Sequence, residues 1–356
     1  MIMDTKHKKH LKWQLPFLLL LIVGSVLIIR KQYSTPYQQC QGNIFGTTYH
    51  ITYQYDDDLQ KDIEAELQKV DSALSMFNQQ SVLSLINRNE RLTVDNQMFI
   101  DVFKLAQQIS AETSGAFDIT VAPLVNLWGF GFKSGTMPTQ EKVDSLRQLI
   151  GYQKVSLETK NTGGNEQLCI KKADPRIMLD CSAIAKGYGV DVVARLLSSK
   201  SIDNYMVEIG GEVITKGISE RRVPWVIGVN KPVENDSLVA SNELQTTLNV
   251  TDMAMATSGN YRRFYYKNGR RYAHTIDPKT GNPVQHSLLS ATVLAKDCAT
   301  ADAYATAFMV MGLDPAKKLL EKHPELMAYL IYTDSQGSYC VWYSPKLSSS
   351  FPSSKE

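Results

Sequence analysis

The alternation of polar and apolar side chains predicts a chain that mixes strands with helices. Residues 44–55 alternate with the two-residue period of a strand, whereas residues 59–74 and 98–113 place apolar side chains three and four positions apart, as amphipathic helices do. Further strands are predicted at 177–179, 205–209, 225–229, 244–250 and 288–295. Further helices are predicted at 186–199, 299–312 and 315–322. This mixture indicates an α+β (α/β mixed) fold in a single domain.

Two hairpins are predicted in the C-terminal third of the chain. An Asn-Gly pair at 268–269 separates two strand-like runs, which is the strongest short signal for a tight hairpin. A two-residue turn there would place Arg263 opposite His274. The guanidinium of Arg263 would then lower the pKa of His274 and keep its imidazole neutral. The second hairpin joins residues 326–332 to residues 338–342.

Residues 13–29 form an apolar run behind a basic segment, residues 1–12, that contains four lysines. At about 17 residues, the run is at the short end of the range for a membrane-spanning helix. The alternatives are a cleaved signal peptide and a lipoprotein signal, but no small-residue cleavage site follows the run, and Cys40 lies far beyond it. We therefore expect an uncleaved transmembrane anchor. The excess of positive charge before the run predicts a cytoplasmic N-terminus and an exported body.

The rest of the chain predicts one folded unit. Residues 30–41 are polar and predict a tether, residues 42–345 contain no linker long enough to divide them, and residues 346–356 predict a loose tail. A net charge of +2 over 356 residues gives no electrostatic argument for nucleic-acid binding. The five cysteines have no CxxC spacing, which argues against a zinc site or a disulfide framework, although their pairing stays open.

Asp302 and Thr306 are four positions apart on a predicted helix, so their oxygens face the same way. Oxygen ligands suit a hard cation such as Mg²⁺, which takes its remaining ligands from phosphates or water. The pair therefore favours metal-assisted chemistry on a phosphate-bearing molecule. The alternative is an acidic residue placed near a helix N-terminus by the helix dipole, with Thr306 bonding back to a carbonyl.

His274 and Asp277 lie close together in a polar turn. An imidazole beside a carboxylate predicts a general base and the group that orients it. The alternative is a histidine that is only a satisfied polar residue, followed by an aspartate that only holds the turn before Pro278.

Three other segments carry candidate ligand contacts. Asp180 ends a predicted strand, a loop of small residues follows, and Lys186 begins a helix, an arrangement that phosphates favour. The alternative there is an ordinary connection with a chance lysine, and the glycine spacing excludes a P-loop. Thr257 and Ser258 predict either nucleotide contacts or a plain loop. Phe117 predicts either a ring that stacks on a flat ligand or a core residue.

Five motifs occur in a fixed order along the chain. They are Asp180-x-x-Ala183-x-Ala-Lys186, Glu208-x-Gly-Gly-Glu212, Thr257-Ser-Gly-Asn-Tyr, His274-Thr-Ile-Asp-Pro-x-Thr-Gly and Ala301-Asp302-Ala-x-x-Thr306. This order and content resemble the ApbE family, the FAD:protein FMN transferases, over roughly residues 42–343. The resemblance implies a single domain of the tunnelling-fold type, often tethered to a membrane.

The resemblance also implies an activity. It implies an enzyme that binds FAD and Mg²⁺, transfers the FMN half to a Thr or Ser hydroxyl of a target protein through a phosphoester bond, and releases AMP. The implied partners are flavoprotein subunits of sodium-pumping NADH:quinone reductases and of Rnf-type electron-transport complexes. The implied location is a bacterial inner membrane, with a single-pass anchor and the catalytic domain on the periplasmic side. The particular acceptor and the oligomeric state stay open.

Residue roles follow from the same resemblance. The implied metal ligands are the carbonyl of Ala183 and the side chains of Asp302 and Thr306, and His274 corresponds to the proposed general base. The implied flavin and adenine contacts are Phe45, Phe77, Ala116, Phe117, Asp118, Asp180, Lys186 and Ile276. Phe45 and Phe77 stand where many members have Met and Tyr, so we expect altered contacts and retained binding.

Two other functions compete with flavin transfer. The same site would serve an FAD pyrophosphate hydrolase that makes FMN and AMP, because only the acceptor differs. A non-catalytic FAD-binding protein is the other alternative, and it would need neither a metal ligand at Asp302 nor a base at His274.

Overall fold

The computed structural model describes residues 15–27, 34–130, 137–162, 165–232, 244–260, 264–267 and 270–351. Its body is built on one eight-stranded antiparallel sheet with the strand order β1-β2-β5-β6-β9-β12-β13-β14. The strands are β1 (Tyr37–Ile44), β2 (Thr47–Gln54), β5 (Tyr205–Ile209), β6 (Glu212–Lys216), β9 (Ala254–Gly259), β12 (Leu288–Ala295), β13 (Met327–Thr333) and β14 (Tyr339–Tyr343). The predicted mixture of helices and sheet is confirmed.

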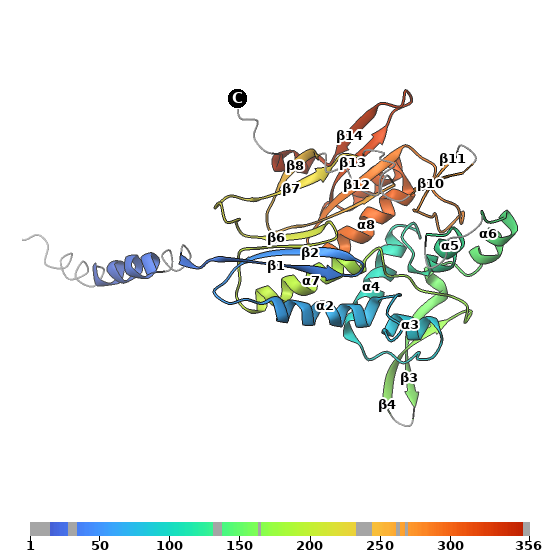
Figure 1. Cartoon of the computed structure of the whole chain (residues 1–356), viewed down its shortest axis with the longest axis horizontal. Helices are drawn as coiled ribbons and strands as arrows, with labels where there is room; N and C mark the ends of the chain where they lie inside the picture. Colours follow the sequence, from blue (N-terminus) through green and yellow to red (C-terminus); the bar gives the residue numbers. More distant parts are fainter. Residues whose placement is uncertain are drawn as a thin grey trace, which may run out of the picture.

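Helices cover one face of this sheet (Figure 1). α7 (Ala185–Ser199) and α8 (Cys298–Met311) lie against the strands, α2 (Gln60–Leu74) packs on α7, and α4 (Gln97–Glu112) packs on α8. The other helices are α3 (Val82–Asn87), α5 (Ala122–Leu127), α6 (Gln140–Arg147) and α9 (Leu313–Lys322), with 3-10 turns at Ile119–Val121, Tyr152–Lys154 and Pro345–Ser350. A separate hairpin, β3 (Val155–Thr162) and β4 (Asn165–Lys172), projects from the body in Figure 1.

The opposite face of the sheet is covered by a second hairpin, β7 (Trp225–Asn230) and β8 (Leu244–Val250). Because successive side chains of a strand point to opposite faces, neighbouring residues of β9 join different cores. Met255 packs in the cluster with β7 and β8, whereas Ala256 packs in the cluster beneath α8. The sheet therefore has a helical face and a hairpin face.

α8 is buried on almost every side, which explains its composition of small and apolar residues. It crosses α7 at very short range: a β-carbon on Gly187 would lie 2.3 Å from the carbonyl oxygen of Cys298. Glycine is required here because the two helices meet backbone against backbone. This contact fixes the position of α8 relative to the start of α7.

The predicted hairpin around residues 268–269 is confirmed. β10 (Phe264–Lys267) pairs with β11 (Arg270–Ala273), and Lys267 lies opposite Arg270, as a two-residue turn requires. Arg263 lies outside the described residues, so its place opposite His274 stays a prediction.

One predicted strand and two predicted boundaries are wrong. Residues 177–179 do not form a strand, because the backbone N–H and carbonyl of Leu179 bond to the side chain of Asn87 and not to a neighbouring strand. Residues 37–41, predicted as part of the tether, belong to β1. The start of the predicted loose tail is a 3-10 turn, and its Leu347 is fully buried in the core on the hairpin face.

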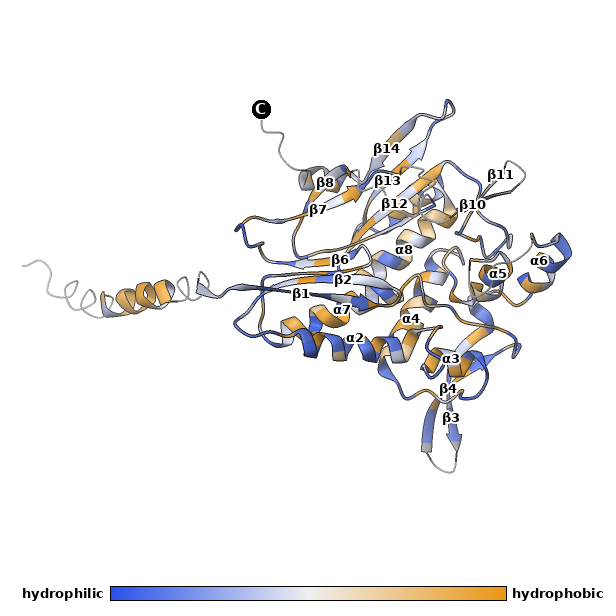
Figure 2. Cartoon of the chain, in the orientation of Figure 1, coloured by the Kyte–Doolittle hydropathy of each residue, from blue (hydrophilic) through white to orange (hydrophobic). Residues whose placement is uncertain are grey.

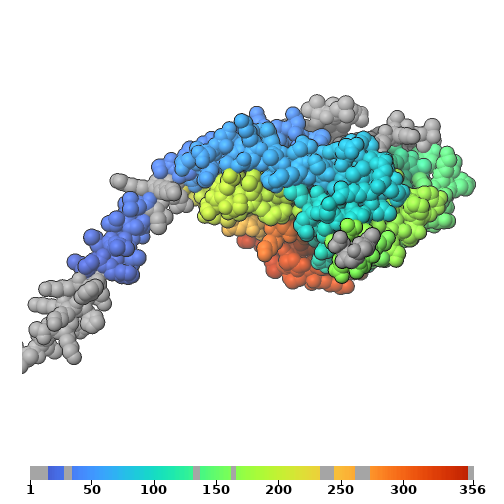
Figure 3. Space-filling view, turned by 90° about the horizontal axis from the view of Figure 1, so that it is seen from below, coloured from blue at the N-terminus to red at the C-terminus, as the bar shows by residue number. Residues whose placement is uncertain are grey.

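The apolar run near the N-terminus forms a helix over residues 15–27. Figure 2 shows this helix as almost uniformly hydrophobic, and Figure 3 shows it apart from the globular body. Its large apolar side chains, from Leu15 to Leu27, are exposed. Within the part of the chain that the structure describes, no helix has the length and apolar character needed to cross a membrane.

Candidate active site

Three charged side chains meet where α7 and α8 begin. Lys186 Nζ lies 2.6 Å from Glu212 Oε1 and 3.7 Å from Asp302 Oδ1. Each residue comes from a different element: Lys186 from the first turn of α7, Glu212 from the start of β6, and Asp302 from α8. Glu212 and Asp302 are only 3% and 2% exposed. We call these three residues the charged cluster.

The charges of this cluster do not cancel. Burial alone would lower the pKa of Lys186, but the carboxylates of Asp302 and Glu212 outweigh burial and raise it. Burial raises the pKa of Glu212 despite the nearby ammonium. Glu212 Oε2 is buried and has no hydrogen-bond partner among the described residues. One ammonium with two carboxylates, and a spare carboxylate oxygen, fit a bound cation.

Backbone groups tie the cluster to the turn before α7. The N–H of Gly187 donates to Asp302 Oδ2 at 3.1 Å, which holds that carboxylate against the first turn of α7. Ala183, whose carbonyl is an expected metal ligand, lies in the turn that leads into the same helix. In the described ranges, no three His, Cys, Asp or Glu side chains form a cluster that could hold a metal ion. A cation here would therefore need carbonyl and hydroxyl oxygens as well.

Ser258 and Thr257 point to different faces of the sheet. Both lie in β9, not in a loop as one alternative held. Ser258 is within hydrogen-bond distance of Thr306, with 3.1 Å between their hydroxyl oxygens. Thr257 instead contacts Thr292 on β12, at 2.9 Å. The structure therefore brings Ser258 next to an expected metal ligand and places Thr257 on the far side of the strand.

The N-terminus of α8 is held by two carboxylates. Asp297 is the local N-cap and accepts the N–H of Thr300 at 2.9 Å. Asp191 reaches across from α7 and accepts the N–H groups of Cys298 at 2.7 Å and Ala299 at 2.9 Å. Burial raises the pKa of Asp191 to about 7, although these two hydrogen bonds oppose the rise. Asp191 thus links the two helices that supply the charged cluster.

Asp180 lies just before this junction. It is buried, its Oδ1 accepts the N–H of Ser182 at 2.8 Å, and its own N–H donates to the carbonyl of Ile119 at 2.6 Å. Burial raises the pKa of its carboxyl group. Asp180 therefore joins the turn before α7 to the segment that contains residues 116–118.

The 116–118 segment is buried, and its side chains mostly contact the rest of the fold. Phe117 is buried in the main core, so its ring is not presented to a ligand. Asp118 accepts hydrogen bonds from Thr120 and from the N–H of Tyr152. Burial raises the pKa of Asp118, against the effect of those bonds. Any contact of Ala116, Phe117 or Asp118 with a ligand would thus rest mainly on the backbone.

The two aromatic candidates have different surroundings. Phe45 lies at the β1–β2 turn with φ of 52° and packs beside α7, where a β-carbon on Gly189 would be 2.7 Å from its ring. Phe77 follows α2 and is 73% exposed. Phe45 is therefore close to the start of α7, whereas Phe77 presents a large apolar ring at the surface.

The segment with His274 follows β11. The imidazole of His274 lies near the Phe130 ring, with 6.3 Å between centroids. Ile276 is buried beside it. Asp277 Oδ1 accepts the N–H of Lys279 at 2.9 Å, which is the bond of a residue that holds its own turn. The turn-forming alternative for Asp277 is therefore observed directly.

Sequence reasoning missed Glu212 and Asp191 as parts of this site. Glu212 ends the Glu208-x-Gly-Gly-Glu212 motif, but the two glycines before it indicated only a close approach of the backbone. Asp191 lies in the middle of an apolar helical stripe, where a charged residue is itself the signal, because buried carboxylates need partners.

Comparison with known proteins agrees with this geometry. The sequence model of the ApbE family matches residues 45–331. A Haemophilus influenzae protein named FAD:protein FMN transferase is 38% identical over 308 residues, covering 83% of this chain and 86% of its own. A Vibrio cholerae protein of the same name is 39% identical over 304 residues, covering 82% and 87%.

Solved structures give the same result. The flavin transferase ApbE from Vibrio cholerae superimposes with a TM-score of 0.76 at 34% identity, covering 89% of this chain and 100% of that one. The apo flavinyl transferase ApbE from Pseudomonas stutzeri gives 0.75 at 30% identity, covering 89% and 97%. The chain is therefore a transferase by class. It belongs to the ApbE family.

Proposed function

We propose that this transferase moves FMN from FAD to a Thr or Ser hydroxyl of an acceptor protein, with Mg²⁺ bound and AMP released. The observation that carries the proposal is the buried charged cluster with its spare carboxylate oxygen. The relatives named FAD:protein FMN transferase support the choice of substrate. Phosphoryl transfer suits such a site, because it needs positioning and charge neutralisation more than covalent chemistry by the protein.

The transfer balances as a single displacement at phosphorus. The acceptor hydroxyl oxygen bonds to the phosphorus of the FMN half, and the bond from that phosphorus to the bridging oxygen breaks. The bridging oxygen leaves on AMP. The hydroxyl proton goes to the imidazole of His274, acting as general base.

The residues around the cluster would hold the cation and the pyrophosphate. Asp302, Thr306 and the carbonyl of Ala183 would bind Mg²⁺, which neutralises charge on the phosphates when it is bound. Glu212 keeps a counter-charge for Lys186, so that the ammonium can donate to a phosphate oxygen. Ser258 orients the hydroxyl of Thr306 through their contact.

The flavin and adenine would be held by groups outside the cluster. Phe77, exposed at the surface, offers a flat apolar face, and Phe45 offers another beside α7. The backbone of residues 116–118, together with Asp180 and Ile276, would form the fixed frame. The exposure of Phe77 supports this role, since a bound ring system would cover it.

The decisive experiment is the intact mass of an acceptor domain after incubation with the full chain, FAD and Mg²⁺. We expect a gain of one FMN that is lost without Mg²⁺ and in Asp302→Asn, whereas Asp314→Asn, an exposed control outside the cluster, keeps it. Free FMN and AMP with no labelled acceptor in a panel of acceptor domains would favour the hydrolase. FAD binding with no turnover would favour a non-catalytic FAD-binding protein and would contradict the proposal.

We also propose that the N-terminal helix tethers the catalytic domain to the inner membrane on the periplasmic side, near membrane-bound flavoprotein subunits of NADH:quinone reductases or Rnf-type complexes. Its support is the exposed apolar surface over residues 15–27 behind a basic segment. Alkaline extraction of cell membranes should retain the full chain and release a chain that lacks residues 1–33. Release of both would exclude the tether.

A further inference from the structure

The segment that carries His274 closes on itself. Backbone hydrogen bonds of 2.8 to 3.0 Å close it, and the pairs that they join are Val284 and Thr275, Asp277 and Asn282, and Gly281 and Asp277. We call residues 274–284 the His274 loop. Because the loop is bonded within itself, the position of His274 depends on the contacts that hold the loop to the rest of the protein.

The tip of the His274 loop is held by a buried indole. Trp128 Nε1 donates to the carbonyl of Gly281 at 2.8 Å, and both residues are buried. Trp128 directly follows α5 and precedes Gly281 by 153 positions. A buried carbonyl that loses its donor is costly, because its desolvation is then no longer offset. This contact therefore fastens the tip of the loop to the end of α5.

α5 and α6 form a small core around this contact. Its buried residues are Leu124, Trp128, Val143, Ile150 and Ile276. Gly281 lies close against it: a β-carbon on Gly281 would be 2.7 Å from Val143. Figure 1 shows α5 and α6 at the end of the molecule away from the N-terminal helix. Since Ile276 belongs to the His274 loop, this core receives both the tip of the loop and one of its side chains.

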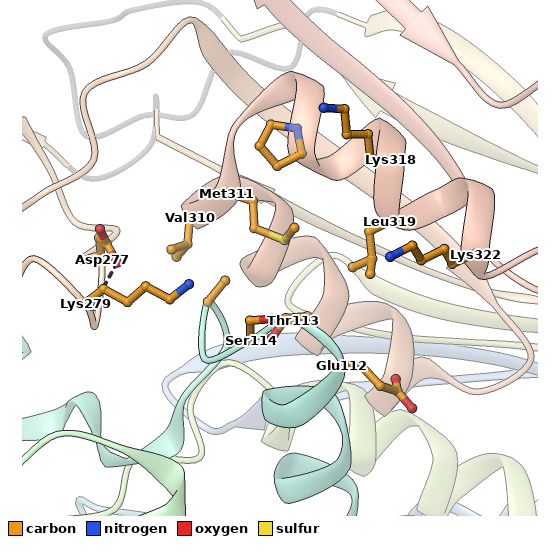
Figure 4. A pocket seen from close by; sticks show the side chains of 12 residues that line it. Glu112, Thr113, Ser114, Asp277, Lys279, Val310, Met311, Lys318, Leu319 and Lys322 are labelled. Carbon is orange, nitrogen blue, oxygen red and sulfur yellow. Dashed lines mark hydrogen bonds between the residues drawn. The ribbon is translucent and has the colours of Figure 1, made fainter.

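Another part of the tip is open to solvent. Lys279 and Thr280 are exposed, and Asp277 and Lys279 line a groove at the end of α8. Figure 4 shows these two residues joined by the hydrogen bond from the N–H of Lys279 to Asp277. The tip is therefore buried at Gly281 and exposed two residues earlier, so the contact with Trp128 is an important part of its attachment.

The segment after α5 also contacts the start of the loop. Phe130 comes two residues after Trp128, and its ring meets the His274 imidazole edge-on, with 6.3 Å between centroids and 69° between the planes. Gly129 lies between them with φ of 80°, a left-handed value that glycine adopts without strain at the end of a helix. Residues 128–130 therefore contact the His274 loop both at its tip and at its imidazole.

We infer that Trp128 is a positioning residue for His274. Its indole N–H holds the tip of the loop, and the chain that follows brings Phe130 against the imidazole. The inference rests on the proposed function, in which His274 takes the proton of the acceptor hydroxyl. A base must lie within hydrogen-bond reach of that proton, and a displacement of about 1 Å costs on the order of a hundredfold in rate. The charged cluster lies on other elements, so its phosphate contacts do not depend on the loop.

Hydrogen–deuterium exchange tests the structural step without turnover. Trp128→Phe keeps an aromatic ring and removes the N–H donor. Trp225→Phe is the matched control: the two tryptophans are 6% and 7% exposed, and Trp225 Nε1 also donates to a carbonyl, that of Lys216 at 3.0 Å, in the core on the hairpin face. In the full chain, we expect residues 274–284 to exchange about tenfold faster in Trp128→Phe and at the wild-type rate in Trp225→Phe. Equal exchange of this loop in the wild type and Trp128→Phe overturns the inference.

Transfer kinetics test the functional step. In Trp128→Phe we expect kcat for acceptor labelling to fall about tenfold, whereas KM for FAD and the Mg²⁺ concentration for half-maximal transfer stay within about twofold. In Trp225→Phe all three should equal the wild-type values. The same fall in kcat in both variants would mean that a general loss of stability was measured, and a raised KM with unchanged kcat would assign Trp128 to substrate binding. Either result overturns the positioning role.

Phe130→Leu is a second variant, which keeps the indole hydrogen bond. The tip of the loop should exchange as in the wild type, and kcat should fall about threefold because the ring contact with the imidazole is lost. This variant decides the question if Trp128→Phe does not fold, since an unchanged kcat in Phe130→Leu would then overturn the inference.

The mass assay for FMN transfer separates the inference from the proposed function. A wild type that labels no acceptor domain overturns the transferase, and with it the catalytic role of the His274 loop, whatever the exchange rates show. A wild type that labels acceptors, with an unchanged kcat in Trp128→Phe, overturns the positioning role alone.

Discussion

The charged cluster and a groove at the end of α8, whose lining includes Lys279, Lys318 and Lys322, are built in opposite ways. The cluster is closed, its carboxylates are almost fully buried, and backbone contacts hold the helices that carry Lys186 and Asp302. The groove is open, and its lysines are exposed on flexible stems. Buried charges depend strongly on geometry, whereas exposed charges act over longer distances and are screened by salt. One region is thus closed and held by fixed contacts, and the other is open to solvent and to salt.

The largest expected effect on transfer tests how little the buried region tolerates. Gly187→Ala would push a β-carbon against the carbonyl of Cys298, and neither backbone can yield easily. We expect unfolding free energy to fall by about 3 kcal/mol and transfer to be nearly lost. In Gly189→Ala the close contact is with the movable ring of Phe45, and Ile209 lies at an ordinary 3.5 Å, so the change should cost about 1 kcal/mol or less. Ser114→Ala in the groove should change stability by less than about 0.5 kcal/mol.

Chemical denaturation of the three variants measures these differences. If Gly187→Ala were as stable and as active as Gly189→Ala, the two helices would not be fixed by their backbone contact, and the contrast between a closed and an open region would fail.

The next effect concerns the charge balance of the cluster. Glu212→Gln removes the nearer partner of Lys186 and leaves the ammonium with Asp302 alone. A cation must then compete with Lys186, so we expect the Mg²⁺ concentration for half-maximal transfer to rise about tenfold, with a stability loss of about 3 kcal/mol. Mn²⁺ binding followed by electron paramagnetic resonance should weaken in parallel.

Glu208→Gln is the matched control for that variant. Glu208 belongs to the same motif but pairs with His50 at 2.8 Å, away from the cluster. The Mg²⁺ concentration for half-maximal transfer should be the same in Glu208→Gln as in the wild type. An identical shift in both variants would mean that the effect is not specific to the cluster.

A third prediction uses the pH dependence of stability. Burial raises the pKa of Asp191 to about 7, so between about pH 4 and pH 7 the folded chain keeps a proton that the unfolded chain has lost. Stability should therefore fall as the pH rises through this window and level off above it, by on the order of 4 kcal/mol from this group. Asp191→Asn should flatten the fall relative to the wild type.

Asp297→Asn provides the comparison, because it alters the other cap of the same helix end without removing the buried carboxyl group. Its stability curve should keep most of the slope of the wild type, because burial is the main cause of the raised pKa of Asp191 and the charge of Asp297 is a smaller one. Parallel curves for the wild type and Asp191→Asn, from urea unfolding at several pH values, would show that Asp191 titrates normally.

The smallest expected effect distinguishes the two faces of β9. Ser258→Ala removes the contact with Thr306 and should slow transfer a few-fold, about 1 kcal/mol, with a higher Mg²⁺ requirement. Thr257→Ala removes the contact with Thr292 on the other face and should affect stability alone. Steady-state rates over a Mg²⁺ titration measure both, and an equal Mg²⁺ shift in the two variants would contradict the assignment of faces.

Local patterns in the sequence predicted much of this architecture. The Asn-Gly hairpin, the long amphipathic helices and the Asp302–Thr306 helix depend on neighbouring residues, and all three are present. The prediction of a strand at residues 177–179 was wrong because the backbone of Leu179 bonds to Asn87, a residue some 90 positions away. The β1 strand was missed because its sequence is mostly polar and does not alternate, which an edge strand with one side toward solvent tolerates.

The site was harder to predict for the same reason. Motif spacing found Lys186 and Asp302 separately, but their shared partner Glu212 is defined by the meeting of β6 with two helices. The link from Asp191 to α8 joins residues more than 100 positions apart. No pattern within one segment contains such information.

The contact between Gly187 and Cys298 also limits how the enzyme can move during turnover. Two helices that touch through their backbones cannot slide or roll past each other without separating. We therefore expect α7 and α8 to move together as one body at the charged cluster. Under the proposed function, an opening that admits FAD or releases AMP would occur in the surrounding turns, near Phe45, Phe77 and residues 274–281, and such motions limit the turnover rate of many enzymes.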